Sequence, residues 1–147
     1  MDKLIQFRGG TKVHNDKKTV DLFRALDPTT SPNALIELSD SNDPRTLRAV
    51  AKHKNTPSPT LGKLLICGNS YDNDLIVKYN ALDNPHTSEQ DIIYVSNFDK
   101  DPGVRKHAKE ILIKRSIEEA DRKVKERRRL LRVVVDNTKG SKDKHQS

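Results

Sequence analysis

The feature that most constrains the fold of this chain is a sequence that nearly repeats itself three times between about Thr30 and Lys109. Each copy begins at a threonine, and the three threonines (Thr30, Thr56 and Thr87) lie 26 and 31 residues apart. Periods of this length are typical of stacked helical repeats, in which each unit contacts only its neighbours. Such arrays bind partners along an extended surface, so the repeat predicts an architecture without naming a ligand.

The three copies share one order of apolar and polar positions. Each has two apolar positions in a first segment, then a polar turn, an apolar–basic pair and an alanine. The aligned positions are Leu35, Leu61 and Ile92; Leu38, Leu64 and Val95; Leu47, Val77 and Val104; and Ala51, Ala81 and Ala108. This order predicts an all-α fold in which each copy is a pair of short helices. We place the first helices over 32–39, 57–66 and 89–96, and start the second helices near 44, 73 and 102.

Side-chain oxygens stand where these helices should begin. A serine stands at the start of each first helix and an aspartate precedes each second helix, and both types accept hydrogen bonds from the free N–H groups of a helix start. Two of the serines are followed by proline, which is tolerated at the first helical position. The predicted caps are Ser31, Ser58, Ser88, Asp43, Asp72 and Asp101.

Four segments follow from this pattern. Residues 1–29 form a loose arm or short strand and a capping helix over 17–26, started by Asp16, whose Val20, Phe23 and Leu26 should cover the first repeat. Residues 30–110 hold the helical repeats. The last repeat continues as a long basic helix over 104–135, and the polar, glycine-containing segment 136–147 is predicted to be disordered.

The run from Asp43 to Pro57 (Asp-Pro-Arg-Thr-Leu-Arg-Ala-Val-Ala-Lys-His-Lys-Asn-Thr-Pro) resembles the unit of the leucine-rich repeat variant family. Ala81 to Thr87 matches the closing part of that unit and Asp101 to Arg105 the opening part. The resemblance covers the three repeats, one closely and two in degenerate form. It implies a short right-handed α-solenoid, similar to HEAT-like arrays. A known member carries an iron–sulfur cluster, but this chain has one cysteine, Cys67, so no cofactor is expected.

The net charge of +7 is confined to one part of the chain. Between Val104 and Arg132 there are twelve Lys/Arg and five Asp/Glu, while the rest of the chain is neutral. A localised basic stripe indicates an acidic partner, either nucleic acid (DNA or RNA) or an acidic protein, and arginine suits phosphate oxygens because its guanidinium binds them in pairs. The predicted binding residues are Lys114, Arg115, Arg122, Lys123, Lys125, Arg127, Arg128, Arg129 and Arg132.

The same helix also carries a heptad pattern. Ile113, Ile117, Ala120, Val124, Arg127, Leu131 and Val134 follow a 4-3-4-3 spacing, which is typical of helices that pair along one seam. The predicted helix-pairing residues are Ile113, Ile117, Val124 and Leu131. They support an alternative hypothesis, in which the chain is a protein-interaction adaptor whose seam pairs with another helix while the groove of the repeats holds an acidic peptide. The seam can also pair with copies of the chain itself.

A second set of basic residues lies within the repeats. Stacking should bring Arg48, Lys78 and Arg105 side by side as a basic ladder on one surface. This ladder can bind phosphates or an acidic peptide. Alternatively, it is neutralised internally by Asp43, Asp74 and Asp101, which lie four or five residues earlier.

Several function classes have no support in the sequence. The five histidines lack metal-ligand spacing, and no serine–histidine–acid grouping stands out, so we expect no metal site, no catalytic residues and no enzyme. The N-terminus lacks the apolar run of a signal peptide, and no stretch approaches the length of a membrane span, which predicts a cytoplasmic location without membrane contact. The first hypothesis is therefore a non-enzymatic helical-repeat scaffold that contacts nucleic acid, or an assembly containing it, through its basic C-terminal helix.

Overall fold

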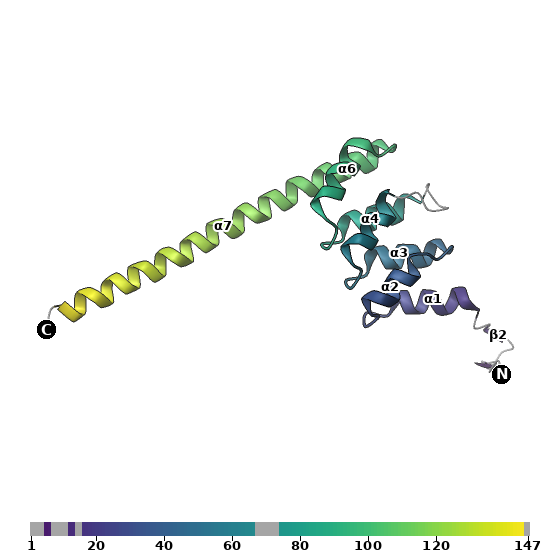
Figure 1. The fold of residues 1–147 in the computed structure, drawn as a ribbon, viewed down its shortest axis with the longest axis horizontal. Coiled ribbons are helices and arrows are strands. Elements are labelled where there is room, and N and C mark those ends of the chain that lie inside the picture. The colour runs from purple at the N-terminus through teal and green to yellow at the C-terminus, as the bar shows by residue number, and fades with distance from the viewer. Residues whose placement is uncertain (1–4, 7–11, 14–15, 67–73, 146–147) are drawn as a thin grey trace. The chain divides into compact units, whose positions relative to one another are not determined.

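The computed structural model describes residues 5–6, 12–13, 16–66 and 74–145, with side chains over 16–66 and 74–139. It divides into two compact units, residues 1–111 and 112–147. The predicted all-helical class is confirmed, apart from β1 (Ile5–Gln6) and β2 (Lys12–Val13), which pair antiparallel with Ile5 opposite Val13. The helices are α1 (Lys17–Leu26), α2 (Pro32–Leu38), α3 (Pro44–Lys52), α4 (Ser58–Ile66), α5 (Leu75–Asp83), α6 (Glu89–Phe98) and α7 (Pro102–His145), as labelled in Figure 1.

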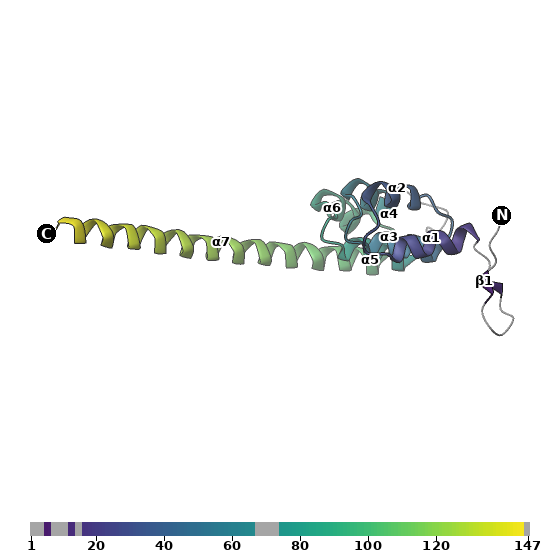
Figure 2. The ribbon, with the colours of Figure 1, turned by 90° about the horizontal axis from the view of Figure 1, so that it is seen from below.

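The helices of the first unit lie in two rows. Figure 2 shows α1, α3 and α5 in one row and α2, α4 and α6 in the other. Neighbours in the first row pack directly, since α3 contacts both α1 and α5. In the second row α4 contacts α6, and α4 also packs against α5 across the rows.

The core contains all the aligned apolar positions of the sequence, together with Val50, Leu65 and Leu82. All three members of each aligned set are buried, with the four sets exposed by at most 3%. The alanines Ala51, Ala81 and Ala108 have no exposed surface, which lets α3, α5 and the start of α7 approach closely. Equivalent sequence positions therefore have equivalent environments.

The three turns that follow α1, α3 and α5 use the same hydrogen bonds. They are the connections 27–31, 53–57 and 84–88. In each, the threonine hydroxyl donates to the carbonyl six residues earlier: Thr30 to Arg24, Thr56 to Val50 at 2.6 Å, and Thr87 to Ala81. Each turn also begins with a side chain that accepts from the N–H two residues later, although the residue types differ: Asp27, His53 and Asn84.

These turns also bond to one another. His53 Nε2 donates to the Asp27 carbonyl at 2.7 Å, while its Nδ1 accepts from the Asn55 N–H at 2.9 Å, so the ring fits only as the neutral Nε2–H tautomer. The Asn84 amide donates to the carbonyls of Ala51 and His53, both at 3.0 Å. The second and third turns are thus each anchored to the turn before, through the buried side chains of His53 and Asn84.

Most predicted helix starts are confirmed. Asp16, Ser31, Asp43 and Ser88 cap α1, α2, α3 and α6 by accepting a backbone N–H, and Asp101 accepts from Val104 in the first turn of α7. Two predictions are wrong. Asp74 caps α5 instead of Asp72, which lies outside the described residues. Ser58 is the first residue of α4, and the Pro57 carbonyl starts that helix by accepting from Thr60 and Leu61.

Two further expectations need correction. The predicted inner face of α1 is outside, because Val20, Phe23 and Leu26 are 40%, 65% and 60% exposed, and α1 instead approaches α3 through the small buried Ala25. At the other end, the segment predicted to be disordered from residue 136 is helical as far as His145. It contains no proline, and its single glycine lowers helix stability by only about 1 kcal/mol, so nothing in it stops the helix.

Candidate nucleic-acid interface

Helix α7 begins within the first unit. Pro102 occupies its first position, Asp101 caps it, and Val104 and Ala108 bury their side chains completely. His107 adds an Nε2–Asp83 Oδ1 contact of 2.7 Å and an edge-on contact with the Tyr79 ring, with ring centroids 5.0 Å apart. These contacts fix the start of a 44-residue helix, which is about 66 Å long at 1.5 Å per residue.

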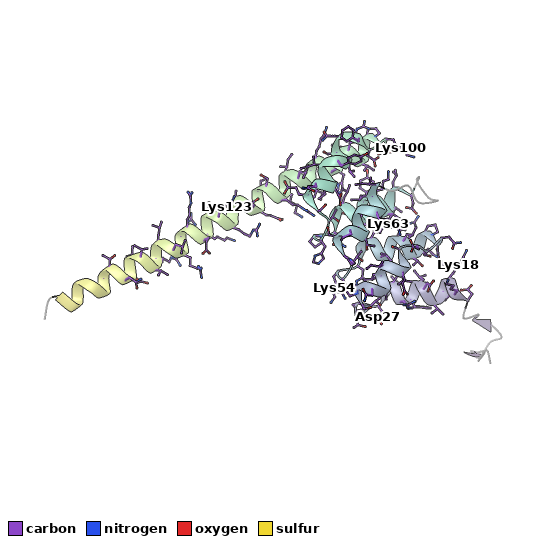
Figure 3. The ribbon with its side chains drawn as sticks, viewed as in Figure 1. Lys18, Asp27, Lys54, Lys63, Lys100 and Lys123 are labelled. Atoms are coloured by element: carbon purple, nitrogen blue, oxygen red, sulfur yellow. The ribbon has the colours of Figure 1, made fainter. Side chains whose placement is uncertain are left out.

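The described side chains of α7 beyond Arg115, from Ser116 to Lys139, are all exposed to solvent. Strong helix formers (Glu, Ala, Lys, Arg and Leu) dominate this stretch, which explains how it stays helical. Figure 3 shows side chains, Lys123 among them, projecting from the helix.

Two acid–base pairs neutralise part of this helix. Lys123 Nζ lies 2.9 Å from Glu119 Oε1, and Arg129 Nη2 lies 2.8 Å from Glu126 Oε1. The hydrogen bond from Lys123 lowers the pKa of Glu119, and the hydrogen bond to Glu126 raises the pKa of Arg129. Arg115 also has interaction partners. Over the described length of α7, no ion pair neutralises the other predicted binding residues: Lys114, Arg122, Lys125, Arg127, Arg128 and Arg132.

Helical geometry separates the basic and apolar residues into two faces. At about 100° per residue, Arg122, Lys125, Arg129 and Arg132 fall within about 80° of one another around the axis, and we call them the basic face. Ile113, Ile117, Ala120, Val124 and Leu131 fall within about 60°, and we call them the apolar seam. The centres of the two faces are about 130° apart. A partner on one face therefore leaves the other accessible.

The apolar seam is uncovered. Its four large members are strongly exposed: Ile113 by 60%, Ile117 by 58%, Val124 by 47% and Leu131 by 64%. Arg127 lies within the seam and Arg128 beside it, so the arginine run Arg127–Arg129 covers several sides of the helix and not one.

The proposed basic ladder of the repeats is occupied by internal partners. Arg48 pairs with Asp74 (Nη2–Oδ2, 2.9 Å), Lys78 pairs with Asp99 (Nζ–Oδ2, 2.7 Å), and Arg105 Nη1 donates to the Asp99 carbonyl at 2.6 Å. The partner acids differ from those predicted, because Arg48 and Lys78 pair with acids of the following repeat. Asp43 pairs instead with Arg45.

One surface that the sequence analysis did not single out lies on α6. Ile93, Tyr94 and Phe98 are 43%, 48% and 70% exposed, and the two rings contact each other with centroids 5.0 Å apart and planes tilted by 42°. The sequence signal for this surface is the spacing of Tyr94 and Phe98, which lie one helical turn apart.

Comparisons with known proteins give no further assignment. A scan against models of known protein families finds no match, and neither the search of curated proteins nor that of solved structures finds a significant one. Across residues 16–66 and 74–139, no three His, Cys, Asp or Glu side chains gather in a way that could hold a metal ion. Among the described helices, none is both long and apolar enough to cross a membrane. Cys67 lies outside the described residues.

Proposed function

We propose that this protein is a non-enzymatic scaffold that contacts nucleic acid, or an assembly containing it, through the basic face of α7. The repeats would form a short right-handed solenoid similar to the leucine-rich repeat variant family and present that helix. The proposal rests chiefly on one observation: four cations follow one another along one side of an exposed helix, and of the four only Arg129 lies in a described ion pair, with the exposed Glu126.

Charge and geometry both favour a phosphate ligand. From Arg122 to Arg132 the basic face rises about 15 Å along the helix, and its three guanidiniums can each bind phosphate oxygens through two parallel hydrogen bonds. An exposed α-helix also fits the major groove of duplex DNA, which is about 12 Å wide. The basic ladder of the repeats does not contribute, since Arg48 and Lys78 are paired with the nearly buried Asp74 and Asp99, and Arg105 donates to the Asp99 carbonyl. The partner of Arg129, Glu126, is by contrast exposed and can give way to a phosphate.

The test is binding of the full chain to duplex DNA and to structured RNA, measured by fluorescence anisotropy over a range of salt concentrations. Four phosphate contacts predict that log affinity falls against log salt with a slope of about −3.6 on duplex DNA. The variant R122Q/K125Q/R129Q/R132Q should bind at least about tenfold more weakly and show a slope near zero.

A matched control removes the same number of charges elsewhere. Lys17, Lys52, Lys54 and Lys100 are exposed on the first unit, and Figure 3 labels the last two. The variant K17Q/K52Q/K54Q/K100Q should keep the affinity and the slope of the wild type. If both variants weaken binding equally, the contact is a general charge effect and the interface is wrongly assigned. Absence of binding to either nucleic acid at low salt contradicts the proposal.

The exposed seam supports a second candidate function, a protein-interaction adaptor that pairs α7 with another helix. The supporting observation is the 47–64% exposure of its four large apolar side chains. A single helix of this kind gains stability mainly when its apolar side packs against something.

A further inference from the structure

The seam of α7 needs a partner whose own surface is apolar along one helical stripe. Five apolar residues with 4-3 spacing form an exposed strip that begins at Ile113 and ends at Leu131, and Val134 and Val135 extend it with 60% and 49% exposure. Contiguous exposed apolar strips of this kind mark interaction surfaces. We propose that the strip is covered by α7 of a second copy of this chain, running antiparallel, with residues 125 and 126 at the centre of the pair.

The charges that flank the seam argue against a parallel pair. In a parallel, in-register coiled coil, Lys123 of one copy lies beside Arg128 of the other, and Lys109 lies beside Lys114. Arg127 would also face its own equivalent across the seam. Both flanking contacts between two charged residues are then repulsive. Such flanking charges set the orientation of paired helices.

The antiparallel arrangement removes these conflicts. With residues 125 and 126 at the centre, Asp121 of each copy lies beside Arg128 of the other, which gives two attractive pairs. Arg127 faces Val124 instead of another arginine, so its aliphatic stem can lie over an apolar side chain while its charge reaches solvent. Ala120 faces Leu131, a small residue against a large one, which suits close packing.

The same charges select the register. Sliding one helix by a heptad in one direction places Asp121 beside the Asp121 of the second copy and Lys114 beside Arg128. Sliding it in the other direction places Arg128 beside Arg128. The central register is thus the one in which the acid on the flank of the seam meets a base.

The basic face remains outside this pair, because it lies about 130° around the helix from the seam. The inference goes beyond the proposed nucleic-acid contact and does not depend on it. A pair of helices of this kind would carry two basic faces.

Sedimentation of the full chain at micromolar concentrations tests the pairing. The wild type should be a dimer. D121R should weaken the dimer about tenfold, since two attractive pairs become repulsive, and R128D should do the same by placing Asp121 beside an aspartate. D121R/R128D should restore the dimer, because the two charges are exchanged. Helicity by circular dichroism checks that each variant is folded, and a failure of the double variant to recover contradicts the register.

Cysteine cross-linking in a C67S background tests the orientation. A mixture of A120C and L131C chains should form a mixed disulfide dimer, whereas either variant alone should not cross-link. Self-cross-linking of A120C indicates a parallel pair and overturns the proposal. A chain that stays strictly monomeric also overturns the proposal. If that monomer co-sediments with anionic lipid vesicles, the seam is assigned to a membrane surface instead. Nucleic-acid affinity measured on the same variants keeps this outcome separate from that of the basic face.

Discussion

Replacing Asn84 should show how strongly the turns hold neighbouring repeats together. The Asn84 side chain is almost fully buried, and its Nδ2 donates to the carbonyls of Ala51 and His53 while its Oδ1 accepts from the His86 N–H. In Asn84→Ala the His86 N–H can turn to water, because His86 is exposed. The Ala51 carbonyl loses the Asn84 donor, at about 1–1.5 kcal/mol, whereas the His53 carbonyl keeps the Thr56 N–H as a donor at 3.2 Å.

The expected loss for Asn84→Ala is therefore about 1–2 kcal/mol, or a decrease in melting temperature of about 5 °C. Urea unfolding followed by circular dichroism measures it. The variant Asn84→Asp separates the two roles of this side chain. It keeps the acceptor for the His86 N–H but places a carboxylate oxygen against the carbonyls of Ala51 and His53. It should be destabilised at least as much as Asn84→Ala. Asn33→Ala, at an exposed position of α2, should change stability by less than about 0.5 kcal/mol.

The result that refutes this reasoning is a wild-type stability for Asn84→Asp. That outcome would mean that the acceptor role within the turn is the important one, and that the bonds to Ala51 and His53 contribute nothing. The hydrogen bonds between turns would then accompany the stacking of the helices without stabilising it.

Two further predictions concern ion pairs. Lys78→Met should lower the free energy of unfolding by about 2–4 kcal/mol, because it leaves the buried Asp99 carboxylate without its partner. Lys63→Met should lower it by less than about 0.5 kcal/mol, because the pair of Lys63 with Asp40 is exposed. Urea unfolding of both variants measures the two losses, and equal losses would contradict the role of burial. The Arg45 hydrogen bond holds the pKa of Asp43 below its ordinary 3.8, so its stabilisation is present above that pH and disappears as the pH falls through the lowered value. Asp43→Asn keeps a good cap and should be less stable than wild type at neutral pH, with the difference vanishing in acid; a difference that persists there would place the effect in the cap.

Much of the first unit could be predicted because its signals are local. A cap such as Ser31 or Asp43 lies within three residues of the N–H that it binds, and the aligned apolar positions follow one helical period. The resemblance of the copies then brought Leu35, Leu61 and Ile92 to equivalent places, and all three are fully buried. The mistakes at α5 came from a connection that is longer than its counterparts, where two aspartates were available as caps.

Contacts between repeats could not be predicted from residue spacing alone. Arg48 lies four residues before Lys52 and five after Asp43, but its partner, Asp74, is 26 residues away. Choosing that partner requires the offset between stacked helices, which no local pattern encodes. The turn residues were hidden for another reason: Asp27, His53 and Asn84 share only the ability to accept one hydrogen bond, so their equivalence is invisible in an alignment by residue type.

The exposed helix posed the opposite difficulty. Its two faces could be predicted from the sequence, because heptad spacing and clustered charge are properties of one helix. Its end could not, because Asn137, Thr138 and Gly140 only weaken a helix and do not terminate it.

The turns that follow α1, α3 and α5 have the same length, five residues each, at 27–31, 53–57 and 84–88. The added length of the second copy lies instead in α4 and in the connection from α4 to α5. Since each turn contains its own threonine and acceptor, a chain cut at one turn and rejoined at another keeps a complete junction. Duplication or recombination at these points would change the number of helix pairs while leaving every junction intact. The turns are therefore natural points for evolution, or an engineer, to lengthen or shorten this protein.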